Sequence, residues 1–277
     1  VGILVLIGVM FTFNTMVFNL LIAAITLIAV HEINNALGFE KKDWLMYAVL
    51  VPYTLLVMLS SYSAMRRLVM PMSFVLVTFF AIYLVVRNGT ISYQKASGLL
   101  VFSGIVIFCF YSFILLKERL PVEKFSYDAV FFILLILCFA WGGDTCAYFA
   151  GRAFGKHKLC PVVSPKKTVE GAIGGVLGTM VFGVVATLIY SIAANRMDAF
   201  TRSNIGVSMY VIIALLVCIA AVLGIYGDLF ASVVKRQCGI KDYGTIFPGH
   251  GGILDRFDSV MFIAPFVTMV ITAVFYV

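Results

Sequence analysis

Residues 208–234 read SMYVIIALLVCIAAVLGIYGDLFASVV, an apolar run whose single charged residue is Asp228. About 20 apolar residues are enough for a helix to cross the hydrocarbon core of a bilayer. A segment in that core must satisfy its own backbone hydrogen bonds, which a helix does. The run therefore predicts a transmembrane helix that carries a carboxylate.

The rest of the chain has the same apolar character. Of its 277 residues 62% are hydrophobic and 12% are charged, and the mean hydropathy is +1.08, whereas roughly a quarter of a soluble domain is charged. We expect an all-α, polytopic membrane bundle of about nine transmembrane helices. The nine apolar segments are 1–13, 15–31, 44–63, 68–86, 98–116, 127–150, 171–194, 208–234 and 257–276. The first two could form one segment, but the break at Phe13-Asn14-Thr15 favours two.

The loops predict an orientation in the membrane. Of the 20 lysines and arginines, 13 follow even-numbered segments and 7 lie in the other loops. Because cytoplasmic loops are enriched in Lys and Arg, the even loops should be cytoplasmic. We divide the chain into N-terminal helices, 1–125 with about five spans, and catalytic helices, 126–277 with about four. The latter carry cytosolic loops 151–170 and 235–256.

A polar stretch interrupts the last apolar runs. Residues 232–258 read SVVKRQCGIKDYGTIFPGHGGILDRFD and carry charges of both signs. Charge next to hydrocarbon is costly, so such a cluster indicates a functional site. Its cations can hold phosphate oxygens, and its carboxylates can hold a hard metal. Its Gly-rich turn can supply backbone N–H donors to an anion.

The stretch also resembles the signature of the phosphatidate cytidylyltransferases (CDP-diacylglycerol synthases). That pattern has the form S-x-φ-K-R-x4-K-D-x-small-x2-φ-P-x-H-G-G-φ-x-D-R-φ-D, in which φ is apolar. Its fixed positions are met by Ser232, Lys235, Arg236, Lys241, Asp242, Gly244, Pro248, His250, Gly251, Gly252, Asp255, Arg256 and Asp258. A basic juxtamembrane loop would explain the cations but neither the carboxylates nor the HGG turn.

Upstream residues extend both the site and the resemblance to about residues 140–260. Asp144 lies in an apolar helix and needs a partner, such as a metal, a cation or water. Gly142 and Gly143 allow another helix to approach closely. In Ser164-Pro165-Lys166-Lys167-Thr168, either Ser164 or Thr168 could cap the seventh helix. Glu170 favours the first turns of that helix.

Carboxylates gather on two predicted helical faces. Asp228, Ser232, Lys235 and Arg236 are spaced i, i+4, i+7, i+8 and share one face. Asp255, Asp258 and Ser259 share another at the start of the ninth segment. Oxygen ligands with bound phosphates favour Mg²⁺, with a second, monovalent cation left open.

The site residues can be named by role. The predicted catalytic residues are Asp228, Asp255, Lys167 and Lys241. The predicted metal ligands are Asp228, Asp255, Asp144 and Asp258. The predicted substrate-binding residues are Lys166, Ser232, Lys235, Arg236, Asp242, Gly249, His250, Gly251, Gly252 and Arg256.

The remaining polar residues predict little chemistry. Six cysteines, mostly in apolar runs and without a CxxC pair, are expected to be reduced packing residues. His31-Glu32 is expected to be a polar anchor at a helix end. Arg66-Arg67 is expected to mark a tight loop.

The resemblance implies that CTP and phosphatidate give CDP-diacylglycerol and pyrophosphate in phospholipid biosynthesis. We expect a bacterial inner membrane, a cytoplasmic active site, a homodimer and no nucleic-acid partner. Two alternatives remain open. One is a CTP-dependent enzyme with another lipid acceptor, such as a polyprenol kinase or an ether-lipid synthase. The other is an ion-coupled transporter, which should show an internal repeat and mid-membrane charges.

Overall fold

The computed structural model describes residues 12–39, 43–125, 127–196, 207–246 and 251–275. Its contacts divide the chain into two units. Unit 1 comprises residues 1–115 and 237–256, and unit 2 comprises residues 116–236 and 257–277. The polar stretch after α10 thus groups with the N-terminal helices. Each unit is described by itself.

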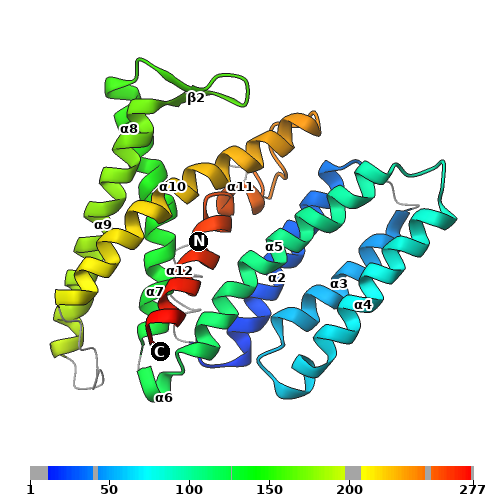
Figure 1. Ribbon diagram of the computed structural model, residues 1–277, viewed down its shortest axis with the longest axis horizontal. Coiled ribbons are helices and arrows are strands. Elements are labelled where there is room, and N and C mark those ends of the chain that lie inside the picture. Colours follow the sequence, from blue (N-terminus) through cyan, green and yellow to red (C-terminus); the bar gives the residue numbers. More distant parts are fainter. Residues whose placement is uncertain (1–11, 40–42, 126, 197–206, 247–250, 276–277) are drawn as a thin grey trace. The chain divides into compact units, whose positions relative to one another are not determined.

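Unit 1 is built from long apolar helices (Figure 1). They are α2 (Met16–Ala36), α3 (Trp44–Met58), α4 (Ser63–Val86) and most of α5 (Tyr93–Arg119), followed late in the chain by the short α11 (Leu254–Phe257). Thr15 begins α2 as its N-cap, since its side chain accepts a hydrogen bond from the Val17 N–H at 3.2 Å. The predicted break at residues 13–15 is therefore confirmed. The segment 1–13 before it lies mostly outside the described residues.

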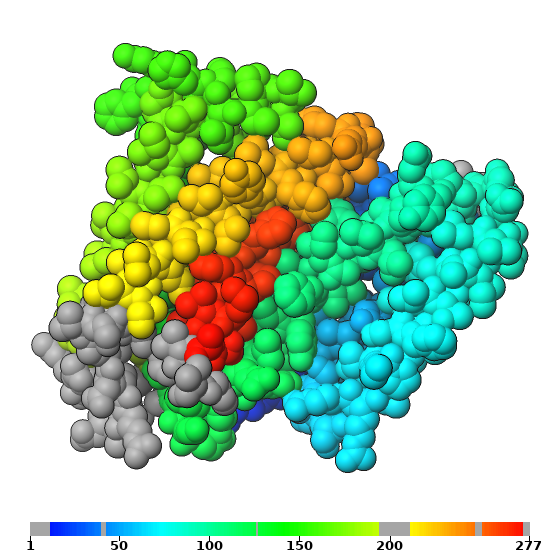
Figure 2. All heavy atoms as spheres, in the orientation of Figure 1, coloured from blue at the N-terminus to red at the C-terminus, as the bar shows by residue number. Residues whose placement is uncertain are grey.

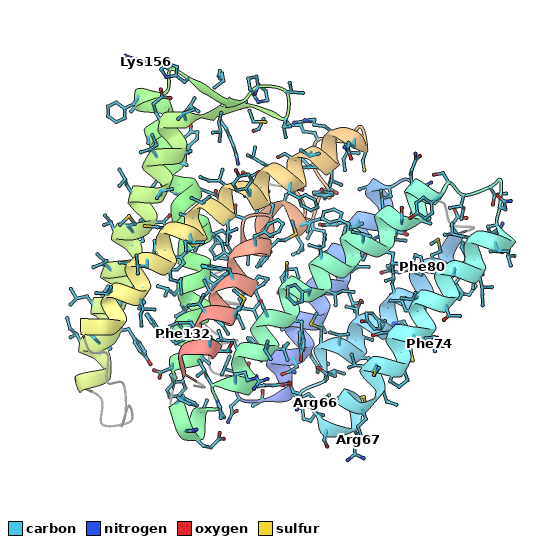
Figure 3. The ribbon with its side chains drawn as sticks, in the orientation of Figure 1. Arg66, Arg67, Phe74, Phe80, Phe132 and Lys156 are labelled. Carbon is cyan, nitrogen blue, oxygen red and sulfur yellow. The ribbon has the colours of Figure 1, made fainter. Side chains whose placement is uncertain are left out.

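Residues 59–62 form the tight turn predicted between α3 and α4. Arg66 and Arg67 lie at the start of α4 and not in the turn itself (Figure 3), and Arg66 Nε donates to the Ser60 carbonyl at 3.2 Å. Farther along α4, Phe74 is 73% exposed and Phe80 is buried. One face of α4 thus packs inward, and the other presents apolar side chains suited to lipid.

Unit 2 contains the second set of helices and one small sheet. Its elements are α6 (Val122–Phe125), α7 (Asp128–Leu137), the π-helix η2 (Cys138–Gly142), α8 (Gly143–Phe154), β1 (Lys158–Cys160), β2 (Ser164–Thr168), α9 (Val169–Arg196), most of α10 (Val207–Gln237) and α12 (Val260–Phe275). The antiparallel hairpin β1–β2 was not predicted within loop 151–170. It stands at the end of the α8–α9 pair (Figure 1) and runs along the upper edge of the view in Figure 2.

The expected fold class is confirmed: the chain is an all-α polytopic membrane protein apart from this hairpin. Among the described residues, six helical segments are long and apolar enough to cross a membrane, and two shorter apolar helices accompany them. The segments 171–194 and 208–234 correspond to α9 and α10. The segment 127–150 corresponds to the continuous run of α7, η2 and α8.

Candidate active site

Asp228 is the centre of a polar cluster in unit 2. It lies in α10, and its Oδ2 forms an ion pair with Lys167 Nζ from β2. Its Oδ1 accepts a hydrogen bond from Ser232, one turn later, at 3.3 Å. The prediction that Asp228 and Ser232 share one face of α10 is therefore confirmed. The structure also brings Lys167 to this face from a segment about 60 residues earlier in the chain.

Asp144 and Asp258 are linked through Ser259. The Ser259 hydroxyl donates to Asp144 Oδ2 at 3.0 Å, and the Ser259 backbone N–H donates to Asp258 Oδ1 at 2.8 Å. Asp144 therefore accepts a hydrogen bond from a hydroxyl group within the same unit. Asp258 and Ser259 lie in the turn before α12, which begins at Val260. The predicted single helical face for Asp255, Asp258 and Ser259 is therefore wrong.

Electrostatic interactions connect these two groups. Asp258 is 9% exposed, and the pKa of its carboxyl is raised to about 8, mainly by burial. The negative charges of Asp228 and Asp144 contribute to this rise, whereas the positive charge of Lys235 opposes it. Lys235 is also 9% exposed. Unit 2 thus gathers three carboxylates with Lys167 and Lys235 in one place.

Small residues bring Asp144 to this position. A Cβ at Gly143 would come within 2.6 Å of Thr179 Oγ1 on α9, and one at Gly142 within 3.0 Å of the Phe182 ring. The predicted close helix approach is therefore confirmed. Asp144 directly follows the π-helical turn η2 and Gly143, and such turns are frequent at functional sites.

A small pocket opens beside Asp144 and Ser259. Gly143, Ala147, Gly175, Thr179 and Gly224 also line it. Its volume is about 20 Å³, which is enough for about one water molecule. The pocket can therefore take a small polar group next to the carboxylate but not a lipid chain.

Asp255 organises the signature residues of unit 1. Its Oδ2 accepts hydrogen bonds from the backbone N–H groups of Tyr243 at 2.8 Å and Gly252 at 2.9 Å. Gly251 has φ +81°, a conformation that side chains disfavour, and a Cβ there would meet the Asp255 carboxylate at 2.8 Å. The predicted role of the glycines in close backbone approach is therefore supported by their geometry.

Glu32 was the residue most clearly misjudged from the sequence. It is only 3% exposed, and both its carboxylate oxygens accept backbone N–H groups of the signature stretch, from Ile253 at 2.9 Å and Leu254 at 2.8 Å. The predicted interfacial anchor is therefore wrong for Glu32. The available signal was its position: a carboxylate next to a long apolar run is costly unless it is paired.

The other predicted site residues lie on exposed surfaces. Five of them are exposed: Lys166, Arg236, Lys241, Asp242 and Arg256. Lys166 lies in β2, Arg236 lies in the last turn of α10, and the other three follow in the signature stretch. The predicted substrate-binding residues Gly249 and His250 lie outside the described residues. The predicted roles of all these residues stay predictions.

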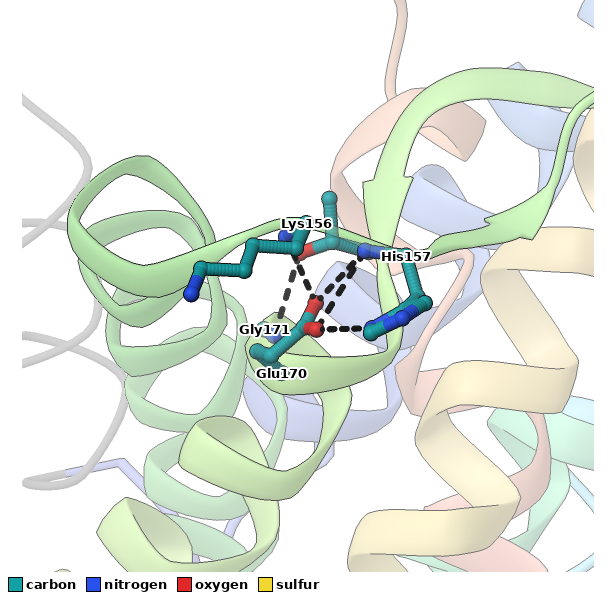
Figure 4. Close-up of polar contacts among 5 residues, drawn as sticks. Lys156, His157, Glu170 and Gly171 are labelled. Carbon is teal, nitrogen blue, oxygen red and sulfur yellow. Dashed lines mark hydrogen bonds and ion pairs between the residues drawn. The ribbon is translucent and has the colours of Figure 1, made fainter.

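Glu170 supports the hairpin that carries Lys166 and Lys167. Its carboxylate accepts hydrogen bonds from the Lys156 N–H at 3.1 Å and the His157 N–H at 3.2 Å, and it contacts His157 Nδ1 at 2.6 Å (Figure 4). At the same open end of the hairpin, Thr168 Oγ1 accepts from the Gly171 N–H at 3.1 Å and caps α9. Thr168, and not Ser164, is therefore the cap.

The donor chemistry of the site suits a hard cation. Asp144, Asp228 and Asp258 supply carboxylate oxygens only. Within the part of the chain that the structure describes, no three acidic, His or Cys side chains stand close enough together to hold a metal. Mg²⁺, however, usually takes only one or two carboxylates and fills its remaining positions with water and substrate phosphates. The residues therefore fit a magnesium ion that is bound together with phosphate oxygens.

Comparison with known proteins agrees with this chemistry. The model of the cytidylyltransferase family matches residues 1–274. A phosphatidate cytidylyltransferase of Bacillus subtilis is 34% identical over 185 residues, which are 66% of this chain and 61% of that protein. Those of Staphylococcus haemolyticus and Staphylococcus saprophyticus are 40% and 42% identical over 144 residues, 52% of this chain and 50% of each relative. The chain thus spans about half the length of the curated relatives it matches.

Proposed function

Because the chain belongs to the cytidylyltransferase family, we propose that it is a phosphatidate cytidylyltransferase, which converts CTP and phosphatidate into CDP-diacylglycerol and pyrophosphate. The observation that carries this proposal is the cluster of Asp144, Asp228 and Asp258 with Lys167 and Lys235 in a membrane-embedded unit. Cations and carboxylates held together in a membrane protein suit nucleotidyl transfer to a lipid. Such transfer depends mainly on positioning and charge neutralisation.

The proposed reaction is an in-line displacement at the α-phosphorus of CTP. An oxygen of the phosphatidate phosphate forms the new bond, the bond between the α-phosphorus and the bridging oxygen breaks, and pyrophosphate leaves with that electron pair. A phosphate monoester has its second pKa near 6, so its oxygen is already largely charged at neutral pH. The reaction therefore needs no dedicated general base.

The residues divide into proposed binding roles. Lys167 and Lys235 balance phosphate charge inside the cluster, and the exposed cations Lys166, Arg236, Lys241 and Arg256 hold the outer phosphates of CTP or the lipid head group. Asp242 orients Lys241 or contacts the ribose. In the Gly249–Gly252 turn, the proposed donors to phosphate oxygens are the backbone N–H groups other than that of Gly252, which donates to Asp255.

Magnesium is the proposed cofactor. Asp228 and Asp255 would be its main ligands, with Asp144 and Asp258 as further ligands or supports, and a monovalent cation could join it. When bound, the metal neutralises the charge that builds up on the phosphates. Asp228 already forms an ion pair with Lys167. This pair supports the proposal that the Asp228 carboxylate is ionised and can interact with a cation.

The cellular setting is also part of the proposal. The apolar helices make the chain an integral membrane protein, and the relatives named above come from Bacillus and Staphylococcus. We propose a bacterial plasma membrane, an active site open to cytoplasmic CTP and a homodimeric enzyme. The excess of Lys and Arg in the loops around the site supports this orientation.

The first experiment measures transfer of label from CTP to lipid. The protein is purified in detergent, supplied with phosphatidate and CTP labelled on the α-phosphorus, and assayed with Mg²⁺ or with EDTA. We expect labelled CDP-diacylglycerol in Mg²⁺ and none in EDTA. In parallel assays with other acceptors, α-phosphorus label that enters only an ether lipid, or γ-phosphorus label that enters only a polyprenol, would change the acceptor. Folded protein that labels no lipid would contradict the proposal and favour the transporter.

A further inference from the structure

Glu32 lies at the end of an otherwise apolar part of α2, and its side chain is buried in unit 1. A buried carboxylate is costly unless its oxygens are hydrogen-bonded. An apolar residue at this place would avoid that cost. What Glu32 contacts should therefore explain why a carboxylate lies here.

Both oxygens of Glu32 contact the signature stretch. Oε1 accepts the N–H of Ile253 at 2.9 Å, and Oε2 accepts the N–H of Leu254 at 2.8 Å. These two amides stand at the start of the four-residue helix α11, next to Asp255. The carboxylate thus holds two consecutive backbone groups of a segment more than 200 residues away in the sequence.

Two signature glycines make room for this contact. A Cβ at Gly244 would come within 2.5 Å of Glu32 Oε1, and a Cβ at Gly252 would overlap the same oxygen. The lack of a side chain at Gly244 and at Gly252 therefore has the same physical reason. Both let the backbone pass close to the Glu32 carboxylate.

The contact of Glu32 joins that of Asp255. Asp255 accepts the N–H groups of Tyr243 and Gly252, so the two carboxylates together bind four backbone amides of one loop. The charge of Asp255 is also close enough to act on Glu32. Two like charges are held near each other here because the amides of the loop satisfy both.

We infer that Glu32 is a positioning residue, which holds residues 252–254 of the signature stretch in the conformation that presents the neighbouring Asp255 to substrate. It does not itself contact the reacting atoms. The inference rests on the proposed function for its catalytic consequence, whereas the support of the loop by Glu32 can be measured without any substrate.

The test compares three variants with the unchanged protein. In Glu32→Gln one oxygen is replaced by an NH₂ donor that faces an N–H group, so one amide loses its acceptor. Glu32→Asp keeps both acceptors on a shorter side chain. Thr26→Val is the matched control, because Thr26 is also buried in α2 but its hydroxyl donates to the Ile22 carbonyl of its own helix.

The first readout is amide hydrogen exchange in peptides that cover residues 251–257. We expect exchange about 10-fold faster in Glu32→Gln, intermediate in Glu32→Asp and unchanged in Thr26→Val. The reason is that a protecting hydrogen bond is lost in Glu32→Gln, weakened in Glu32→Asp and kept in Thr26→Val. Exchange in α4 should not change in any variant. Equal exchange of residues 251–257 in Glu32→Gln and the unchanged protein would overturn the inference.

The second readout is steady-state turnover of CTP and phosphatidate. Misplacing catalytic groups by about 1 Å can cost about 100-fold, so we expect kcat of Glu32→Gln to fall 10- to about 100-fold, with KM for CTP changed less and with partial recovery in Glu32→Asp. Faster exchange with kcat within about twofold of normal would overturn the positioning role. If the protein without any substitution shows no cytidylyltransferase activity, only the proposed function is contradicted. The exchange result still decides whether Glu32 holds the loop.

Discussion

At the scale of single residues, each carboxylate of the candidate site is held by a specific polar partner. Asp228 pairs with Lys167, Asp144 accepts from Ser259, and Asp255 accepts two backbone amides. Partners of this kind keep a charged group in place where few water molecules can solvate it. The site is therefore organised before any substrate binds, which is what electrostatic catalysis requires.

Asp228→Asn should abolish most of the activity while the protein still inserts and folds. The amide keeps the shape of the side chain but loses the charge that pairs with Lys167 and, in our proposal, with the metal. Loss of one preorganised electrostatic contact typically costs about 100- to 1,000-fold in kcat. Initial rates of CDP-diacylglycerol synthesis in saturating CTP measure this loss.

Asp128→Asn is the matched control for that variant. Asp128 belongs to the same unit and accepts a hydrogen bond from Tyr190, which an amide oxygen can also accept. We expect nearly normal rates. Activity of Asp228→Asn equal to that of this control would disprove the role of Asp228.

At the scale of elements, the pair α8–α9 carries the site on closely packed small residues. Gly171, Gly174, Gly175 and Gly178 of α9 face Ala147, Ala150, Gly151 and Cys146 of α8. Small residues let two helix backbones approach closely, and van der Waals packing is the main attraction between helices in lipid. This packing fixes where Asp144, near the start of α8, stands.

Gly174→Ala should destabilise the α8–α9 pair. The added Cβ would overlap the Cβ of Ala150, and overpacking of this kind costs about 1–3 kcal/mol. We expect a lower midpoint of thermal unfolding in detergent and a reduced rate, because Asp144 shifts with its helix.

Gly104→Ala on α5 serves as the control, since a Cβ there meets nothing within 4 Å. Alanine is a better helix former than glycine by about 1 kcal/mol, so this variant should unfold at the same or a slightly higher temperature. Equal unfolding midpoints for the two variants would mean that α8 and α9 do not depend on the glycine contacts.

At the scale of the whole molecule, the chain combines lipid-facing helices with a polar loop system. The helices α4 and α9 are mostly exposed in the structure, with apolar residues such as Met70 and Ile189 on their surfaces. That exposure is expected of helices whose solvent is lipid. Two dense groups of charged residues lie instead in the hairpin and in the signature stretch.

The charge distribution predicts a measurable orientation. In a variant without the six natural cysteines, Lys166→Cys in the exposed hairpin should react with a membrane-impermeant maleimide only after cell lysis. Tyr62→Cys in the turn before α4 should react in intact cells, because that loop belongs to the Lys- and Arg-poor set. The opposite labelling pattern would refute the cytoplasmic site, and labelling of both variants after lysis is the control.

The sequence by itself determined where the helices are and which stretch carries charge. The predicted segment 208–234 became α10, at Val207–Gln237, and the segment 171–194 became α9, at Val169–Arg196. A bilayer demands long, uninterrupted apolar runs, and this demand can be read from neighbouring residues alone. The face shared by Asp228 and Ser232 followed from helical spacing for the same reason.

Only the tertiary structure decided which side chains meet. The partners Asp144 and Ser259 lie 115 residues apart, and Glu32 and Leu254 lie 222 residues apart. Local periodicity does not encode such pairs, because they depend on how distant helices pack. The sequence therefore predicted the carboxylates of unit 2 but misread Glu32, whose role depends on a loop that folds against it from the far end of the chain.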